Sequence, residues 1–408
     1  MLTALNLERG RTFWTVLLGF FIVAATRGLA ADYSWDGKGT GGNLNDWLAK
    51  QNWGNTAAPG AADNGIFSSV LASNSVTPTL SGTASIQGIR YNAGAAAFTI
   101  GGAGALTLGS NGITNNSTTP QVNNLYLVLN APQTWNANAG ALSFGGPLNL
   151  QANALTIAGS QSVTSSGTIS GTGGLVKNGA GILTLSDANT YSGGTTINGG
   201  RVAVNNTAGS GTGYGSVTIN NNGTLGGTGS IAGVVTNNAG GTIAPGNSVG
   251  QLNTGTEVWN GGSTLLLEIN SVNAGAGIGW DLLNISGGLR ITATSGNKVF
   301  IDLRSLTLAN TPGAVSNFDS SQNYIWTIAR TISGVSFATG ENEATVFDLL
   351  LGGFSNGLNG GSFSVALSNG GNDLNLVFTS VPEPGTWALM LIGLGGVWFA
   401  RRQNFPRR

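Results

Sequence analysis

Short apolar-x-apolar triplets separated by turn residues recur through the middle of this chain. Residues 106–108, 155–157, 183–185, 202–204 and 217–219 are triplets of this kind. Such strict alternation indicates a strand, and the Gly and Asn residues between the triplets supply the turns. Because the turns are so frequent, we expect strands of about four to six residues. Many short strands without a long hydrophobic run favour an all-β fold built as a coiled ladder over a two-sheet sandwich.

Glycine and asparagine allow such a ladder to turn its corners. Glycine accounts for 68 of the 408 residues, more than twice its usual share of ~7%. Corners require positive φ, which Gly and Asn tolerate best. Asn side chains stacked on successive rungs can also hydrogen-bond along the ladder axis. Charged residues make up only 8% of the chain, which is typical of a stacked fold because like charges on neighbouring rungs would repel.

The composition excludes several kinds of chemistry. The chain has no His and no Cys, which removes Ser-His-Asp and Cys-His catalysis, thiolate or imidazole zinc sites and disulfides. Its 16 basic residues are spread over 408 positions, whereas a nucleic-acid binder needs a clustered basic face. We therefore predict no cofactor, no metal site and no nucleic-acid partner.

Residues 1–30 have the pattern of a secretory signal peptide. Arg9 and Arg11 form a basic start, residues 13–25 are apolar, and small residues precede a cleavage point after Ala30. As a helix the apolar run would rise about 20 Å, short of the ~30 Å hydrocarbon core of a membrane. Cleavage is thus favoured over a membrane anchor, although Arg27 just before the cleavage point argues against it.

Residues 381–408 carry a second signal. A Pro-Glu-Pro motif precedes an apolar stretch, residues 385–400, which we predict to be a short transmembrane helix. The arginines that follow would hold this end in the cytoplasm. The residues of the predicted sorting and processing motif are Val381, Pro382, Glu383, Pro384, Arg401 and Arg402.

This tail resembles the PEP-CTERM sorting signal, in which a Pro-Glu-Pro motif, a short transmembrane segment and a basic cluster follow one another. In that family an exosortase, a membrane protease, recognises the tail. The resemblance implies export from a Gram-negative-type cell that often makes exopolysaccharide. It also implies a transient anchor in the inner membrane through residues 385–400, followed by display on the cell surface or release.

Residues 171–204 resemble the autotransporter-associated β-strand repeat, also called the passenger-associated transport repeat, and residues 223–250 resemble the segment that commonly follows it. The fold of that family is a right-handed parallel β-helix, so the resemblance implies this architecture. The positions that match the repeat are Gly173, Leu175, Lys177, Gly179, Gly181, Leu183, Leu185, Asn189, Thr190, Tyr191, Gly193, Gly194, Thr195, Ile197 and Gly200.

An aromatic cluster precedes the predicted ladder. Trp35, Trp47, Trp53 and Phe67 are arranged as at the start of many proteins with this repeat. We interpret the cluster as a cap over the exposed first rung. Because aromatic rings also stack on sugars, the three tryptophans are alternatively a glycan contact. Trp135 is predicted to be a rung residue inside the helix.

These observations divide the chain into five segments. Beyond residue 257 the predicted strands lengthen, and we expect residues 251–380 to form the final rungs and a β-capping region, with a separate β-sandwich domain as the alternative. The segments are the signal peptide (1–30), the Trp-rich N-terminal cap (31–70), the β-helix (71–250), the final rungs and cap (251–380) and the sorting tail (381–408).

The sequence favours a non-catalytic surface or matrix protein, acting in adhesion and touching exopolysaccharide. The alternative is a β-helical polysaccharide lyase or glycosidase, which needs carboxylates that converge in one cleft. The candidate acids are Asp187, Glu257, Glu268, Asp281, Asp302, Glu341, Glu343 and Asp348.

PEP-CTERM tails also occur on some ice-binding proteins. Ice recognition would favour a flat and regular ladder of Thr-x-Thr pairs. Along this chain such pairs occur only sporadically, at 77 and 79, 254 and 256, and 292 and 294.

Overall fold

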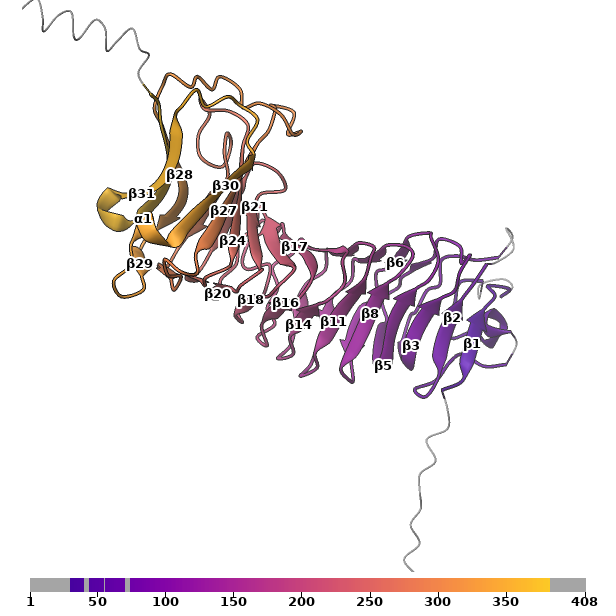
Figure 1. Ribbon diagram of the computed structural model, residues 1–408. Helices are drawn as coiled ribbons and strands as arrows, with labels where there is room; N and C mark the ends of the chain where they lie inside the picture. Colours follow the sequence, from indigo (N-terminus) through magenta and orange to yellow (C-terminus); the bar gives the residue numbers. More distant parts are fainter. Residues whose placement is uncertain (1–29, 40–43, 55, 70–73, 382–408) are drawn as a thin grey trace, which may run out of the picture.

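A computed structural model describes residues 30–39, 44–54, 56–69 and 74–381. These residues form an elongated parallel β-solenoid that runs from β1 at one end to β29 and β31 at the other (Figure 1). The all-β fold expected from the alternating triplets is confirmed. Three sheets lie along the solenoid, and every strand pair within the first two is parallel.

The first sheet has 16 strands and extends the length of the solenoid. Its main path is β1 (Asp32–Trp35), β2 (Asn64–Phe67), β3 (Thr83–Tyr91), β5 (Ala105–Asn115), β8 (Gln133–Ala137), β11 (Leu155–Gly159), β14 (Leu175–Lys177), β16 (Thr195–Ile197), β18 (Val217–Ile219), β20 (Val235–Asn237), β23 (Glu257–Trp259), β26 (Leu289–Ile291) and β29 (Val335–Phe337); β7 (Tyr126–Leu129), β10 (Leu148–Asn149) and β13 (Ile169–Ser170) branch from β5.

The second and third sheets complete the coil. The second consists of β4 (Thr99–Ile100), β6 (Gln121–Asn123), β9 (Leu142–Phe144), β12 (Val163–Ser165), β15 (Ile182–Leu185), β17 (Gly200–Val204), β19 (Gly223–Gly227), β21 (Thr242–Pro245), β24 (Thr264–Ile269), β27 (Val299–Ser305) and β30 (Phe347–Gly353). The third consists of β22 (Gln251–Thr254), β25 (Leu282–Ile285), β28 (Tyr324–Thr331), β32 (Asp373–Thr379) and β31 (Ser362–Ser368).

The core is a set of inward stacks in which each residue lies on its equivalent in the next rung. One stack on the first sheet includes Trp135, which is buried in β8 as the sequence predicts. Aliphatic side chains dominate this stack because it faces the interior of the coil. Its members, in order, are Ile113, Trp135, Ile157, Lys177, Ile197, Ile219, Asn237, Trp259 and Ile291.

Many of the solenoid strands are shorter than the expected four to six residues. Strands β14, β16 and β18 have three residues each. They end early because stacked corners bring backbones into contact. A Cβ on Gly179 would lie 2.2 Å from the carbonyl oxygen of Gly159, and one on Gly181 would lie 2.0 Å from that of Gln161. Only glycine permits this approach. Residues that could have lengthened the strands therefore lie in the corners instead.

Residues 251–380 extend the same coil. Strands β23 and β26 continue the first sheet, and β24, β27 and β30 continue the second. The strands lengthen here, with six residues in β24 and eight in β28. Pairing changes only in the third sheet, where β32 is antiparallel to both β28 and β31. These pairings favour final rungs with a terminal sheet over a separate β-sandwich.

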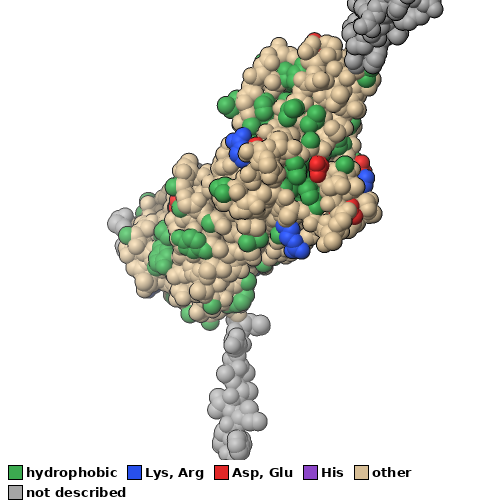
Figure 2. All heavy atoms as spheres, turned by 90° about the vertical axis from the view of Figure 1, so that its left-hand side faces the viewer, with side chains coloured by type: hydrophobic (Ala, Val, Ile, Leu, Met, Phe, Trp, Pro, Cys, Tyr) green, Lys and Arg blue, Asp and Glu red, His purple; other side chains and the backbone are tan. Residues whose placement is uncertain are grey.

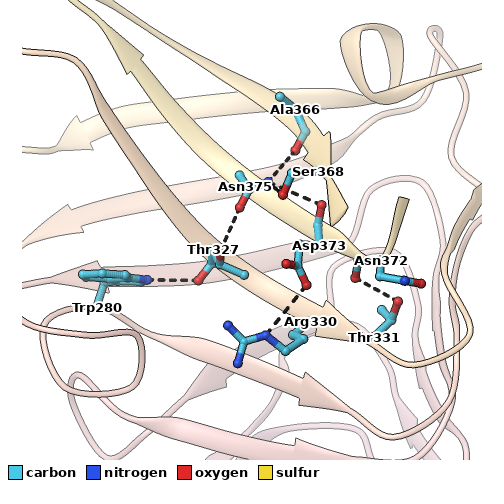
Figure 3. A network of polar contacts seen from close by, with 9 residues as sticks. All are labelled: Trp280, Thr327, Arg330, Thr331, Ala366, Ser368, Asn372, Asp373 and Asn375. Carbon is cyan, nitrogen blue, oxygen red and sulfur yellow. Dashed lines mark hydrogen bonds and ion pairs between the residues drawn. The ribbon is translucent and has the colours of Figure 1, made fainter. Parts of the chain in front are cut away.

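A polar network ties the antiparallel strands together (Figure 3). Buried Asn375 on β32 accepts a hydrogen bond from the Thr327 hydroxyl at 2.8 Å and donates to Ser368 Oγ at 2.9 Å. Arg330 and Asp373 form an ion pair at 3.7 Å beside it. One amide side chain thus joins β28, β32 and the end of β31, which fixes the last sheet of the molecule.

Helix is a minor part of the described residues. It comprises α1 (Glu343–Val346) and the short 3-10 helices η2 (Lys50–Trp53) and η3 (Asn369–Gly371). None of the helices in the described part of the chain is long and apolar enough to cross a membrane. The predicted transmembrane segment, residues 385–400, and residues 1–29 of the predicted signal peptide lie outside the described residues.

The aromatic cluster fills the interior of the first rungs. Trp35, Trp47, Trp53 and Phe67 are all buried, with ring centroids 4.9 Å apart for Trp47 and Trp53 and 5.2 Å apart for Trp35 and Trp53. The indole nitrogen of Trp35 donates to the carbonyl oxygen of Ser75 at 2.9 Å. This packing has the geometry of a cap that shields the start of the inward stacks from water.

Replacing Trp47 with alanine tests the cap. Removal of a fully buried indole leaves a cavity against Trp53 and Phe67, so we expect Trp47→Ala to lower the free energy of unfolding by about 3–5 kcal/mol. Leu48→Ala is the control, because the adjacent Leu48 side chain is 45% exposed and its loss should cost less than about 1 kcal/mol. Urea denaturation measures both; similar losses in the two variants would contradict the cap.

Candidate functional site

A row of threonines runs across the outer face of the first sheet. Thr134, Thr156, Thr196, Thr218 and Thr236 occupy one register position on successive rungs. Val176 takes the same position between Thr156 and Thr196. Because neighbouring strands are ~4.8 Å apart, the hydroxyls repeat at that spacing except at the rung that carries Val176.

An asparagine ladder lies beside the threonine row. Asn178, Asn198, Asn220, Asn238 and Asn260 each follow a strand of the first sheet and stack on one another. Each Nδ2 donates to the Oδ1 of the preceding asparagine, at distances between 2.7 and 2.9 Å. The axial hydrogen bonding of stacked asparagines predicted from the sequence is confirmed.

The two rows together form one polar surface, which we call the Thr/Asn face: Thr134, Thr156, Thr196, Thr218, Thr236 and the five ladder asparagines. Three asparagines follow a threonine of the row by two residues, which places both on the same side of the sheet. Asn198, Asn220, Asn238 and Asn260 each donate one N–H of the side-chain amide along the stack, so the second N–H is left to face a ligand or water. The face therefore offers ordered, uncharged hydrogen-bonding groups.

Charged side chains of the described residues form no cluster on the end of the molecule beside β31. Figure 2 shows this end, where charged side chains are scattered among polar and apolar ones. Four ion pairs are formed by the described residues, all with at least one half-exposed partner.

Several residues that match the repeat are buried or join neighbouring rungs. Leu175, Leu183 and Leu185 are buried in the inward stacks. Asn189 accepts a hydrogen bond from the backbone N–H of Ile169 at 2.7 Å and donates to the carbonyl oxygen of Gly211 at 2.6 Å. The side chain therefore joins three successive rungs.

The other repeat positions are at corners or beside them. The hydroxyls of Tyr191 and Thr195 lie 2.6 Å apart in the interior. Gly193 stacks so closely on Gly173 that a Cβ would lie 2.5 Å from its carbonyl carbon. Gly194 has a φ of 81°, while Thr190 is exposed.

Lys177 is a buried cation in the main inward stack. The residue is 1% exposed, between Ile157 and Ile197, and its Nζ donates to the carbonyl oxygens of Gly179 and Gly199. Burial lowers the pKa of Lys177 to about 8. Corner carbonyls thus satisfy the ammonium group, which explains how the repeat holds a lysine without a carboxylate partner.

Glu257 is the buried acid of the core. The Thr254 hydroxyl donates to its Oε1 at 2.7 Å and the Trp259 indole to its Oε2 at 2.6 Å. Burial raises the pKa of Glu257 to about 7, although both hydrogen bonds favour the ionised form. No substrate can reach this carboxyl group, because the residue is fully buried.

Asp281 is a second buried acid with a structural position. The backbone N–H groups of Gly250 and Glu268 donate to its two carboxyl oxygens, each at 2.8 Å. Burial raises the pKa of Asp281 well above its usual range, against the effect of these hydrogen bonds and of Arg201. The side chain thereby joins β24 to the segment directly before β22.

Two of the candidate acids, Glu268 and Asp302, line one surface hollow of about 470 Å³. They lie on neighbouring strands, with Glu268 directly opposite Arg304. Arg304 donates to Asp302 Oδ2 from Nε at 3.2 Å and from Nη2 at 2.8 Å. Burial raises the pKa of Glu268, while Arg304 and Arg201 counter this effect.

The remaining candidates do not converge. Asp187 accepts a hydrogen bond from Thr168, and Glu341 accepts from Ser295 and Thr345. Glu343 begins α1, and Asp348 is on β30. None of these residues lines the hollow.

The three tryptophans proposed as a glycan contact are buried. Trp35, Trp47 and Trp53 are each at most 2% exposed. Since a sugar ring needs an open aromatic face, this packing offers none, and it favours the cap interpretation. Val381 of the sorting motif is exposed, while Pro382, Glu383, Pro384, Arg401 and Arg402 lie outside the described residues.

Comparisons with known proteins agree with the repeat and the tail. Residues 175–204 match the family described as passenger-associated-transport-repeat, and residues 380–408 match the PEP-CTERM protein-sorting motif. The chain carries both motifs. Together they point to export and a cell-surface location for this β-solenoid.

One curated relative is similar to this chain over part of its length. The adhesin BmaC autotransporter of Brucella suis biovar 1 (strain 1330) is 45% identical over 85 residues, which are 21% of this chain and 2% of the adhesin. The chain thus matches a small fraction of that protein's length.

The sequence did not reveal the Thr/Asn face as one surface or the hollow. The threonines of the row are separated by unequal numbers of residues, so a search for Thr-x-Thr pairs along the chain passes over them. Glu268 and Arg304 are joined only by the pairing of β24 with β27. The recurring apolar-Thr-apolar triplets were the available signal for the row.

Glu257→Gln tests the buried acid. The folded chain holds the Glu257 proton more tightly than the unfolded chain, whose ordinary pKa is 4.5. The resulting stability is therefore present below about pH 4.5 and is lost as pH rises through about 7. Glutamine stays neutral and can donate to Thr254 while accepting from Trp259, so the variant should be more stable than the wild type at pH 8 by on the order of 3 kcal/mol.

The measurement is urea denaturation of both proteins between pH 4.5 and pH 8. The difference between them should close towards pH 4.5. A difference that stays constant with pH would show that Glu257 does not titrate in this range.

Proposed function

We propose that this chain is a non-catalytic, exported, right-handed β-helix that acts in adhesion or in an exopolysaccharide-associated matrix. It would be displayed on the cell surface or released from it. The Thr/Asn face carries this proposal. A polysaccharide presents repeated hydroxyls, and a rigid row of hydroxyls and amides can bind them through many individually weak hydrogen bonds.

The physical character of the Thr/Asn face supports a neutral polymer as its ligand. Its side chains are uncharged and partly exposed, and the asparagines are held in line by their own hydrogen bonds. Preorganised groups lose little conformational entropy on binding. The similar protein is named as an adhesin, which is consistent with this role.

The tail supplies the proposed route to the surface. Residues 1–30 would be removed on export, and residues 385–400 would hold the chain transiently in the inner membrane. An exosortase would then process the tail near Val381, Pro382, Glu383 and Pro384. The PEP-CTERM match over residues 380–408 supports this sequence of events.

The enzyme alternative is less well supported. Of the eight candidate acids, Glu268 and Asp302 line one hollow, but both Arg304 hydrogen bonds to Asp302 engage a single carboxylate oxygen. The two acids are on adjacent strands of one sheet rather than on opposite walls. A glycosidase instead places its two carboxyl groups on either side of the scissile bond.

The first test replaces three threonines of the row at once. Thr196→Val, Thr218→Val and Thr236→Val keep the β-branched shape, and Val176 already occupies this register position. We expect the triple variant to bind xylan and hydroxyethyl cellulose about tenfold more weakly, because three hydrogen-bonding groups are lost. Affinity electrophoresis in gels that contain each polymer measures the change.

The matched control carries Thr164→Val and Thr184→Val on the outer face of the second sheet, where the two residues are also paired in register. It should bind each polymer like the wild type. Equal binding by the triple variant and the wild type, or no retardation of the wild type, would contradict the proposed function of the Thr/Asn face.

The second test concerns the tail. Intact-mass spectrometry of exported protein should give a chain that begins after residue 30 and ends near residue 384. Glu383→Ala should accumulate as full-length protein in the membrane fraction, because the motif for processing is altered. Recovery of Arg408 in wild-type protein from the medium would contradict processing.

A further inference from the structure

The hollow beside Glu268 owes its shape to a break in the stacking. Strand β30 follows β27 in register until Leu350 lies opposite Asp302, but Gly353 then lies opposite Arg304. The extra residue in β30 makes a bulge, which bends a strand locally. Gly352 in this bulge would have no atom within 4 Å of an added Cβ. Open space therefore remains over this part of the second sheet.

Polar groups lie on one side of the hollow. The carboxylate of Glu268 makes no hydrogen bond or ion pair with any described residue, although the residue is half-buried. Arg304 is held by Asp302 through two hydrogen bonds, which fixes its planar group. One acceptor without a protein partner thus stands beside one oriented donor.

Apolar groups and a rigid frame form the rest of the hollow. Leu306, Pro312 and Leu350 line it. The Ser305 hydroxyl accepts a hydrogen bond from the backbone N–H of Ser355 at 2.7 Å, which joins the end of β27 to the chain after β30. The pairing of β27 with β30 and this hydrogen bond therefore frame the hollow.

We propose that this hollow binds one neutral sugar unit. Vicinal hydroxyls of a pyranose can donate to Glu268 and accept from Arg304, while its C–H groups pack against Leu306, Pro312 and Leu350. A volume of about 470 Å³ lies in the range of small-molecule sites. A uronate would place its charge against Glu268 and Asp302, so a neutral unit fits better.

This site deepens the proposed function and rests on it. The Thr/Asn face gives extended contact along a polymer, whereas the hollow would hold a single unit with defined orientation. The two sites are on different sheets, the first and the second, so each can be altered without the other.

The experiment measures binding of cellobiose, maltose, lactose and digalacturonate to the full chain by isothermal titration calorimetry. We expect at least one neutral disaccharide to bind more tightly than digalacturonate. Glu268→Gln removes the acceptor charge at constant size, and Gly352→Leu fills the hollow at a position with space for it. Each should weaken binding of that disaccharide at least tenfold.

Two matched variants serve as controls. Asp348→Asn removes a carboxylate on β30 outside the hollow, and Gly296→Leu adds the same side chain at another glycine with no atom within 4 Å of an added Cβ. Both should bind like the wild type, and thermal unfolding should confirm that all four variants fold. Product analysis should recover the disaccharide intact.

Several results would overturn the inference: no binding of any neutral disaccharide, tighter binding of digalacturonate, unchanged affinity in Glu268→Gln and Gly352→Leu, or cleavage of the disaccharide. The triple threonine variant separates this inference from the proposed function. If that variant loses polymer binding and the wild type binds no disaccharide, the proposal for the hollow fails and the proposed function of the Thr/Asn face stands. If the wild type binds a disaccharide in the hollow but no polymer, the proposed function of the Thr/Asn face fails and the proposal for the hollow stands.

Discussion

Rung-on-rung stacking is the constraint on which the rest of this structure depends. Each inward side chain meets its equivalent one rung away, at the ~4.8 Å spacing that backbone hydrogen bonds impose. The stack from Ile113 to Ile291 shows the result, since a residue that fits one rung must also fit its neighbours. Corners obey the same rule, because the backbones there approach too closely for any Cβ at Gly179 or Gly181.

The stack tolerates polar residues where the corners or neighbouring residues can satisfy them. Lys177 reaches two corner carbonyls, and Glu257 receives hydrogen bonds from Thr254 and Trp259. Each group lies in a low-dielectric interior, and desolvation shifts its pKa towards neutrality. Burial therefore destabilises the charged form of each residue. The hydrogen bonds offset part of this destabilisation but not all of it.

The local sequence pattern was sufficient to predict the fold. Features that depend on which residues pair across rungs could not be predicted from it. Alternation around Trp135 and glycine-rich turns were sufficient to predict short stacked strands, and the abundance of asparagine was sufficient to predict axial hydrogen bonds. The alignment of Thr196 with Thr218 and Thr236 depends on corner lengths that differ from rung to rung. The burial of Trp35, Trp47 and Trp53 fits the cap that we expected, but the sequence alone left the sugar platform as an alternative, because aromatic rings occur in both.

A perfectly regular solenoid can form faces but not hollows, since each rung covers the one before it. A site with depth therefore requires an interruption of the repeat. One such interruption in this chain is the bulge between β27 and β30, after the strands have lengthened, and Glu268, Asp302 and Arg304 lie beside it. Like charges would repel if they were stacked at every rung, whereas opposite charges on neighbouring rungs can face each other, as Glu268 and Arg304 do.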